Sequence, residues 1–269
     1  MLKILQIVGN STFGGATYLL DKWTRYLINK GCAVDILATD EKTVTLLNKI
    51  EQVRIIKNIF IPRHISPVSD IRAALQLITL FHKQRYDIVH TYTSAPGFIG
   101  RITARIMGVP VIVHHQAGWA VTEYSPLLSR LLYMPLEYFV TLVSTKSICV
   151  SHSTRLMARR LHLAPDFKLV TICNGIDSNA FLDDVCISSR KHYRTMLGIA
   201  EDQILIGSTG RLAPQKEFPT LIQAFADLKL SISGKNIVLV IAGEGSEYEK
   251  LKQLAVRLGI QNQVQINNT

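Results

Sequence analysis

Short aliphatic runs alternate with longer amphipathic stretches along most of the chain, which is the order expected of repeated strand and helix units. Residues 16–30, for example, have the apolar spacing of a helix that buries one face, and Gly31 follows where helices commonly end. Seven runs in the first part are predicted to be strands of a parallel sheet, and they cover residues 2–8, 33–38, 53–56, 87–91, 109–114, 147–150 and 169–172.

A second series of the same kind begins near residue 204. It predicts strands at 204–208, 237–242 and 264–266, separated by helices at 219–230 and 246–258. The polar residues 178–189 read as a connection. The fold class is therefore α/β with two doubly wound parallel-sheet domains, one at 1–181 and one at 182–269. Because such sheets usually have five or six strands, we interpret the second domain as truncated; a genuine three-stranded lobe is the alternative.

Composition excludes several classes of protein. The chain has 269 residues, of which 48% are apolar and 19% charged, so it can bury a core and is not disordered. No apolar run approaches the roughly 18 residues of a membrane span, and the apolar start is too short for a secretory signal. A cytoplasmic location is predicted. The four cysteines are far apart, which disfavours a zinc knuckle or a disulfide framework and suggests small buried residues.

The net charge of +10 is concentrated in the first domain. Residues 1–181 contain 20 Lys and Arg against 11 Asp and Glu, whereas residues 182–269 contain 10 against 9. A basic surface attracts nucleic acid, anionic lipid headgroups or phosphorylated small molecules, and it can also serve solubility alone. No module interleaves basic and aromatic residues, so nucleic acid is not an expected partner.

Two loops have the composition of anion sites. Gly14 and Gly15 lie between the first strand and the first helix, where backbone amides and a helix N-terminus favour negative charge. The loop lacks the GxGxxG spacing of dinucleotide-binding proteins, and a plain strand-to-helix turn is the alternative. In the second domain, Gly210 and Arg211 precede Lys216; an arginine fork and a lysine charge suit a phosphate, although loop cations are often only solvated.

Histidines occur at two strand ends, where open α/β sheets commonly bind ligands. His90 ends one strand, and His114 and His115 end another. Adjacent residues of a strand point to opposite faces, so His114 and His115 cannot readily bind one ion together, and no metal site is predicted. A structural role for each histidine is the alternative.

In combination these segments resemble the retaining nucleotide-sugar glycosyltransferases of the GT-B fold, specifically glycosyltransferase group 1 / family 4. The similarity extends over nearly the whole chain. It includes Gly14 and Gly15, the histidine-bearing strand end at 90–96, and Asn174-Gly175-Ile176-Asp177. It also includes the segment from Gly210 to Lys216 and Ala242-Gly243-Glu244-Gly245.

The resemblance implies a hexosyltransferase-type reaction that moves a sugar from a nucleotide donor, UDP-linked by expectation, to a glycan or lipid-linked acceptor with retention. Gly210, Arg211 and Lys216 would hold the donor diphosphate in place of a metal ion. Gly14, Gly15, His90 and Trp119 would belong to the acceptor side, and the basic first domain would suit peripheral contact with an anionic membrane at its inner face. The function that the resemblance implies would belong to the biosynthesis of surface polysaccharide or glycolipid.

Three departures from the family pattern are visible. The family's histidine before Gly118 is replaced by Ala117, so His115 is the candidate catalytic histidine if the register differs by one or two residues. Glu217 stands after Lys216 where glycine is usual. Two glutamates seven residues apart, which would contact the donor, are expected only after residue 269. We therefore expect this polypeptide alone to bind nucleotide sugars poorly and to show little or no transfer.

Two other functions remain open from the sequence. One is a noncatalytic remnant or partner protein that retains the glycosyltransferase fold, which Ala117 favours. The other is a Rossmann oxidoreductase, against which the missing GxGxxG motif counts.

Overall fold

The computed structural model describes residues 1–9, 15–62, 66–176, 187–231 and 236–267. The chain forms two compact units, Met1–Gly175 and Ile176–Thr269, which we describe separately as unit 1 and unit 2. The predicted domain boundary after residue 181 lies outside the described residues and stays a prediction.

Unit 1 is built on a seven-stranded parallel sheet with the order β3-β2-β1-β4-β5-β6-β7. All seven strands predicted from the apolar runs are present, and their ends differ from the predicted ones by two residues at most. The strands are β1 (Lys3–Gly9), β2 (Ala33–Ala38), β3 (Arg54–Ile56), β4 (Ile88–Tyr92), β5 (Val111–Gln116), β6 (Lys146–Cys149) and β7 (Leu169–Thr171).

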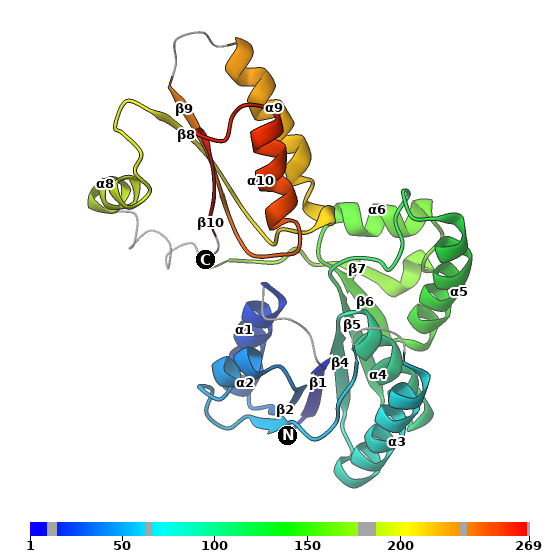
Figure 1. Cartoon of the computed structure of the whole chain (residues 1–269). Helices are drawn as coiled ribbons and strands as arrows, with labels where there is room; N and C mark the ends of the chain where they lie inside the picture. Colours follow the sequence, from blue (N-terminus) through cyan, green and yellow to red (C-terminus); the bar gives the residue numbers. More distant parts are fainter. Residues whose placement is uncertain (10–14, 63–65, 177–186, 232–235, 268–269) are drawn as a thin grey trace. The chain divides into compact units, whose positions relative to one another are not determined.

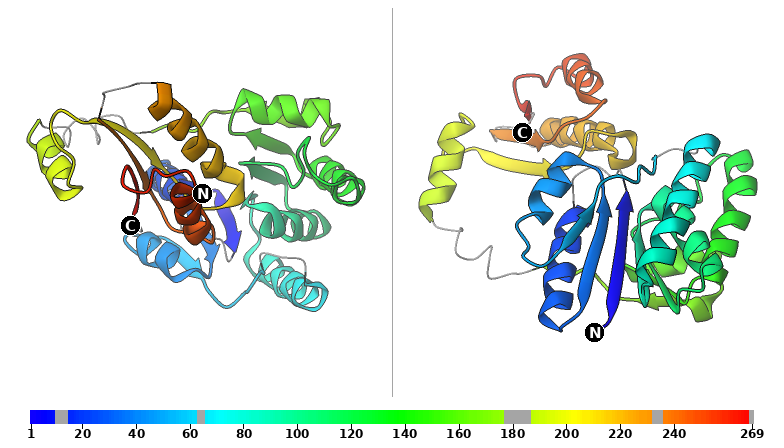
Figure 2. Two further views of the ribbon diagram at one scale, coloured as in Figure 1. Left: turned by 45° about the horizontal axis from the view of Figure 1, so that its top comes forward. Right: turned by 90° about the horizontal axis from the view of Figure 1, so that it is seen from below.

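Helices cover both faces of this sheet, as Figures 1 and 2 show. On one face, Leu20 and Leu47 pack against the aliphatic side chains of β1 and β2, and on the other Leu77 and Ile99 pack against Ile7. The first face carries α1 (Gly15–Asn29) and α2 (Glu41–Leu47). The second carries α3 (Pro67–Gln84), α4 (Ser94–Ile106), α5 (Leu127–Val143) and α6 (His152–Arg160), with a 3-10 turn, η1 (Asp166–Lys168), before β7.

Unit 2 has a three-stranded parallel sheet with the order β10-β9-β8. One face is covered by Phe218, Ile222 and Leu251, while Ile199 packs on Val238 and Val240 on the other. The elements are α8 (Ile187–Met196), β8 (Ile204–Thr209), η2 (Pro214–Lys216), α9 (Phe218–Ser231), β9 (Ile237–Ala242), α10 (Tyr248–Arg257) and β10 (Val264–Asn267).

Two sequence expectations were wrong in detail. Helix α8 begins at Ile187, inside the stretch predicted to be a connection; it is tied to the following loop by buried Arg194, which donates to the carbonyls of Ala200 and Gln203. Among the cysteines, Cys149 is buried as predicted, but Cys32 is only half-buried, and Cys173 is exposed because it lies after the last strand of unit 1. No helix among the described residues combines the length and apolarity needed to cross a bilayer.

Candidate functional site

The strand order of unit 1 reverses between β1 and β4, and ligands of open α/β sheets bind beside the carboxyl ends of such strands. The backbone is tightly packed there. Gly9, which ends β1, has a φ of 65°, and a Cβ at this position would lie 2.5 Å from Pro96 Cγ. Thr93, between β4 and α4, has a φ of 59°. A β-branched residue in this region is strained, and such strain concentrates at ligand-binding sites.

A cluster of four rings lies on the α1 face of the sheet at this edge. The His90 ring stacks on Tyr92 at 4.4 Å between centroids, and Tyr92 contacts His115 at 5.4 Å. Trp23 of α1 meets the edge of His90 at 6.4 Å. The parallel register pairs Tyr92 with His115, which is why β4 and β5 deliver these side chains to one place. The structure thus brings together two of the histidines singled out from the sequence.

Burial keeps both histidines of this cluster neutral. Loss of hydration lowers the pKa of His90 to about 3, with a smaller contribution from the nearby His115, and burial also lowers the pKa of His115. The Tyr92 hydroxyl lies 3.2 Å from His90 Nδ1 and shares a hydrogen bond with it. His90 Nε2 and His115 Nδ1 are buried without a hydrogen-bond partner among the described residues. An unsatisfied atom of this kind is available to a ligand where its residue lines a cavity, as His115 does.

His115 also lines a cavity of about 380 Å³ in unit 1. Helix α1 supplies one wall through Lys22, Trp23 and Tyr26, and the ends of β6 and β7 supply the opposite wall. A lysine, two aromatic rings and a neutral imidazole around one space suit a polar ligand with an apolar face, such as a sugar. In the sequence, Trp23 is one of the apolar residues of the helix predicted at 16–30. Its role in this wall depends on the tertiary packing of α1.

His114 points to the opposite face of β5, as the alternation of the strand predicts. Its Nδ1 lies 2.8 Å from Thr91 Oγ1, and its ring packs so closely on Gly97 that a Cβ there would lie 2.5 Å from Cε1. Burial, followed by the positive charge of Arg101, holds its pKa well below the usual range. His114 is therefore a core residue of the α4 face, away from the cavity.

The remaining acceptor-side residues predicted from the sequence have different surroundings. Trp119 is only 9% exposed, packs in the core with Cys149 and Leu169, and donates its indole N–H to the Thr154 carbonyl at 2.8 Å. The indole N–H of Trp119 is thus bonded within unit 1, and the assignment of Trp119 to the acceptor side stays a prediction. Gly15 is the exposed first residue of α1. Gly14 lies outside the described residues.

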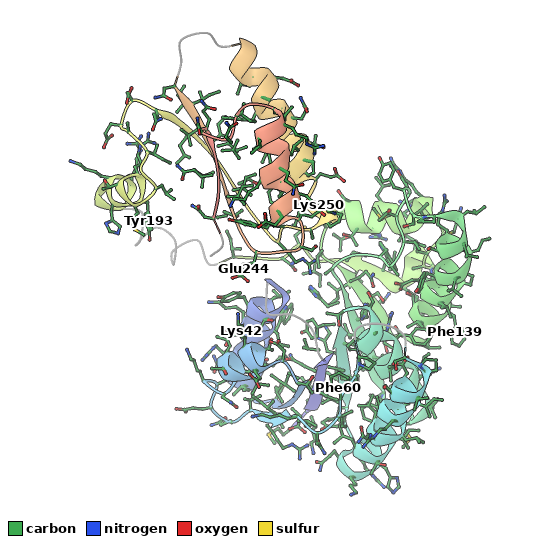
Figure 3. All side chains as sticks on the ribbon, in the orientation of Figure 1. Lys42, Phe60, Phe139, Tyr193, Glu244 and Lys250 are labelled. Atoms are coloured by element: carbon green, nitrogen blue, oxygen red, sulfur yellow. The ribbon has the colours of Figure 1, made fainter. Side chains whose placement is uncertain are left out.

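In unit 2 the loops after β8 and β9 are bonded to each other through their backbones. Gly210 N donates to Ala242 O at 3.0 Å, and Leu212 N donates to Glu244 O at 2.8 Å. A Cβ on Gly243 would lie 1.9 Å from Gly210 O, so only glycine permits this approach. Glu244 is labelled on this loop in Figure 3. The segment from Gly210 to Leu212 is thereby held in one conformation.

This braced loop carries the predicted phosphate-binding residues. Arg211 and Lys216 are both exposed, and a Cβ on Gly210 would lie 3.7 Å from Lys216 Cε, so the lysine chain runs beside the glycine. Glu217 follows in the left-handed conformation, with a φ of 52°. That conformation explains in physical terms why glycine is usual at this position. The described part of the chain contains no group of three His, Cys, Asp or Glu residues that could hold a metal ion.

Comparison with known proteins identifies the family. Residues 13–180, more than half of the chain, match the family described as Glycosyltransferase Family 4, and residues 189–268 match Glycosyl transferases group 1. The chain belongs to glycosyltransferase family 4. The membership and the GT-B-like α/β fold predicted from the sequence are thereby confirmed.

Individual relatives of this family 4 protein include polysaccharide enzymes. An Escherichia coli protein described as UDP-Gal:alpha-D-GlcNAc-diphosphoundecaprenol alpha-1,3-galactosyltransferase is 32% identical over 205 residues, which are 73% of this chain and 51% of that protein. The capsular polysaccharide biosynthesis glycosyltransferase CapM of Staphylococcus aureus is 28% identical over 81% of this chain and 56% of its own length. The chain thus spans about half the length of these relatives.

Among solved structures, a glycosyltransferase from Rickettsia africae ESF-5 superimposes with a TM-score of 0.74 over 99% of this chain and 68% of its own, at 18% identity. At this identity the likeness supports the fold alone.

Proposed function

We propose that this family 4 protein takes part in transferring a sugar from a nucleotide-sugar donor, UDP-linked by expectation, to a glycan or lipid-linked acceptor with retention of configuration. Family membership and the braced loop that carries Arg211 and Lys216 support the donor half of this proposal. The named substrates of the Escherichia coli relative, a UDP-sugar and a diphosphoundecaprenol-linked acceptor, support the choice of substrate classes.

The proposed chemistry of the donor site is electrostatic. As the bond between sugar and diphosphate breaks, negative charge develops on the leaving phosphate oxygens. Arg211 would bind two of these oxygens through its planar fork, and Lys216 would contribute a mobile positive charge. No metal ion is required in this scheme, so we expect transfer to continue in the presence of a chelator.

On the acceptor side we propose that the cavity at His115 binds a sugar ring. Its aromatic wall suits the apolar face of a pyranose, and His115 Nδ1 supplies an unsatisfied polar atom for a hydroxyl. The neutral state of His115 fits hydrogen bonding to an uncharged hydroxyl.

A transfer assay over UDP-, GDP- and ADP-sugars tests the proposal. Turnover by this polypeptide alone should be slow and confined to one nucleotide class, with a product of unchanged anomeric configuration and a rate unaffected by chelation. Even slow transfer from one of these nucleotide sugars would show which of them is the donor. Arg211→Ala should lower this rate at least tenfold, while Arg257→Ala, an exposed arginine of the same unit, should leave it unchanged.

A noncatalytic binding or partner protein is the second candidate. Ala117 stands where the family pattern expects histidine, and the Glu217 carboxylate follows Lys216 directly. Binding of a nucleotide diphosphate without turnover of any donor would favour this candidate over the enzyme.

A further inference from the structure

Helix α5 has an outer face that is almost wholly apolar. Seven of its large apolar side chains are at least 40% exposed, at positions spaced as one stripe along the helix: Leu127, Leu128, Leu131, Leu132, Tyr138, Phe139 and Leu142. The two most exposed are Leu128 at 80% and Leu127 at 70%. Phe139 is labelled in Figure 3 at the outer margin of unit 1. We call these seven residues the α5 stripe.

No charge interrupts this stripe. The 17 residues of α5 include only two charged side chains, Arg130 and Glu137. Glu137 is buried on the inner side, where its carboxylate accepts from the Ala120 amide, and Val140 and Thr141 are buried with it. Arg130 is partly buried. A helix that is apolar on both its inner and outer faces is typical of one that contacts a second apolar phase.

A basic surface lies next to the α5 stripe. Tyr133 and Met134 of α5 pack in one cluster with Met157 and Ala158 of α6, so the two helices are neighbours (Figure 1). On α6, a hollow of about 460 Å³ is lined by side chains at helical spacing, three of them histidine or arginine: His152, Ser153, Arg155, Leu156 and Arg159.

The charge of this part of unit 1 is strongly positive. Residues 94–168 contain eight Lys and Arg against three Asp and Glu, a balance of 8 − 3 = +5. Two of the acids form ion pairs on α6, Glu123 with Arg160 at 3.5 Å and Asp166 with Arg155 at 2.9 Å. Glu137 is buried, so the net surplus is carried by other cations, among them Arg159 of α6 and Arg130 of α5. Apolar side chains beside an excess of cations are the combination that binds an anionic lipid surface.

We propose that the α5 stripe, with the basic face of α6 beside it, is the surface by which unit 1 binds an anionic lipid bilayer. The inference deepens the proposed function and rests on it, because a lipid-linked acceptor is presented at a bilayer surface. The aromatic rings of Tyr138 and Phe139 suit the boundary between headgroups and acyl chains. In a symmetric pair of chains joined through this face, the same surface would meet itself and bring like charges together, which disfavours a second copy as the occupant.

Sedimentation with lipid vesicles tests this surface without donor or acceptor. The chain should sediment with vesicles of phosphatidylcholine that contain about 30% phosphatidylglycerol, and less well with phosphatidylcholine alone or at high salt. Leu128→Glu/Leu131→Glu should lower the partition coefficient at least tenfold. The matched control is Met196→Glu/Val256→Glu, which adds the same charge at two exposed apolar positions of unit 2 and should sediment as the wild type. Circular dichroism checks that each variant is folded.

Three outcomes would overturn the proposal. The wild-type chain could stay in the supernatant, or the α5 variant could sediment with vesicles as well as the wild type does. Alternatively, the wild type could form a dimer in sedimentation velocity that the α5 variant lacks, while neither protein binds vesicles. Titration with UDP on the same proteins separates the two proposals. Binding of UDP without vesicle binding removes the membrane surface alone, and vesicle binding without UDP binding removes the proposed donor function.

Discussion

Individual residues at the carboxyl edges of both sheets have conformations or surroundings that composition alone does not predict. The sequence indicated His90 and His115 because both follow aliphatic runs, but their contact with Tyr92 and Trp23 depends on the register of β4 and β5 and on the position of α1. Thr93 gives no signal in the sequence, because β-branched residues rarely adopt the positive φ of 59° that the structure gives it. The burial of Trp119 could not be predicted, because a tryptophan near a strand end is equally suited to a cleft and to the core.

Buried His90 makes the stability of unit 1 depend on pH. Its pKa is about 3 in the folded protein because of burial, and about 6.5 when unfolded, so the unfolded chain binds the proton more tightly. Above pH 6.5, His90 is neutral in both states and does not reduce the free energy of unfolding. As the pH falls from 6.5 toward 3, only the unfolded chain takes up the proton, so the free energy of unfolding decreases. At pH 5 this decrease is roughly 2 kcal/mol.

Urea unfolding followed by tryptophan fluorescence measures this effect, because Trp23 and Trp119 are the two tryptophans of the chain and both belong to unit 1. The free energy of unfolding of the wild type should be lower at pH 5 than at pH 7, and His90→Gln should reduce this difference by roughly 2 kcal/mol. His82→Gln, a change at an exposed histidine of α3, should leave it unaltered. An equal pH dependence in wild type and His90→Gln would contradict the assignment.

Glu217 offers a second prediction at the residue scale. Its carboxylate follows Lys216, so its removal should strengthen binding of a nucleotide diphosphate by about twofold to fivefold through lower repulsion. Glu217→Gln removes the charge and keeps the left-handed residue, whereas Glu217→Gly also relieves the backbone. Comparison of their UDP affinities separates the two effects. No gain in either variant would show that this carboxylate does not act on the bound anion.

At the scale of elements, the sequence predicts the strands well and some helices poorly. Aliphatic runs bounded by turn residues predicted all seven strands of unit 1 and all three of unit 2, because parallel strands buried on both faces require continuous apolar side chains. Helix α8 was not predicted, because its apolar residues are few. The exposure of the α5 stripe could not be predicted, since an apolar helix reads as buried until its neighbours are known. The mutual bracing of the loops after β8 and β9 is likewise a tertiary feature.

Because the loops after β8 and β9 approach each other so closely, one added methyl group should markedly lower the stability of unit 2. In Gly243→Ala the new Cβ would overlap Gly210 O, so the loops must separate and the bond from Gly210 N to Ala242 O must lengthen. We expect faster amide exchange at Gly210 and Leu212 and a loss of about 2 kcal/mol or more in stability. Gly207→Ala is the control, because a Cβ there has open space. Equal rates of amide exchange at Gly210 and Leu212 in the two variants would contradict the claim that the two loops hold each other in place.

At the scale of the whole molecule, family membership, a basic unit 1 and a three-stranded unit 2 define the protein. The fold and the family followed from ordered motifs over most of the chain. The sugar and acceptor do not follow, because the fold hosts more than one chemistry and the substrates depend on contacts of particular side chains. The proposed sugar transfer and the alternative, nucleotide binding without transfer, both require that Arg211 and Lys216 bind a diphosphate.

Titration of the chain with UDP, followed by the amide signals of unit 2 in NMR spectra, tests that claim most directly. We expect weak saturable shifts in the loop from Gly210 to Lys216. Arg211→Ala and Lys216→Ala should each lower the affinity at least tenfold, as expected for loss of a charge-assisted bond of about 1.5–3 kcal/mol. Arg257→Ala and Lys252→Ala, at exposed positions of α10, should bind as the wild type. UDP binding that is equal in all five proteins, or that shifts signals only outside this loop, would contradict the account.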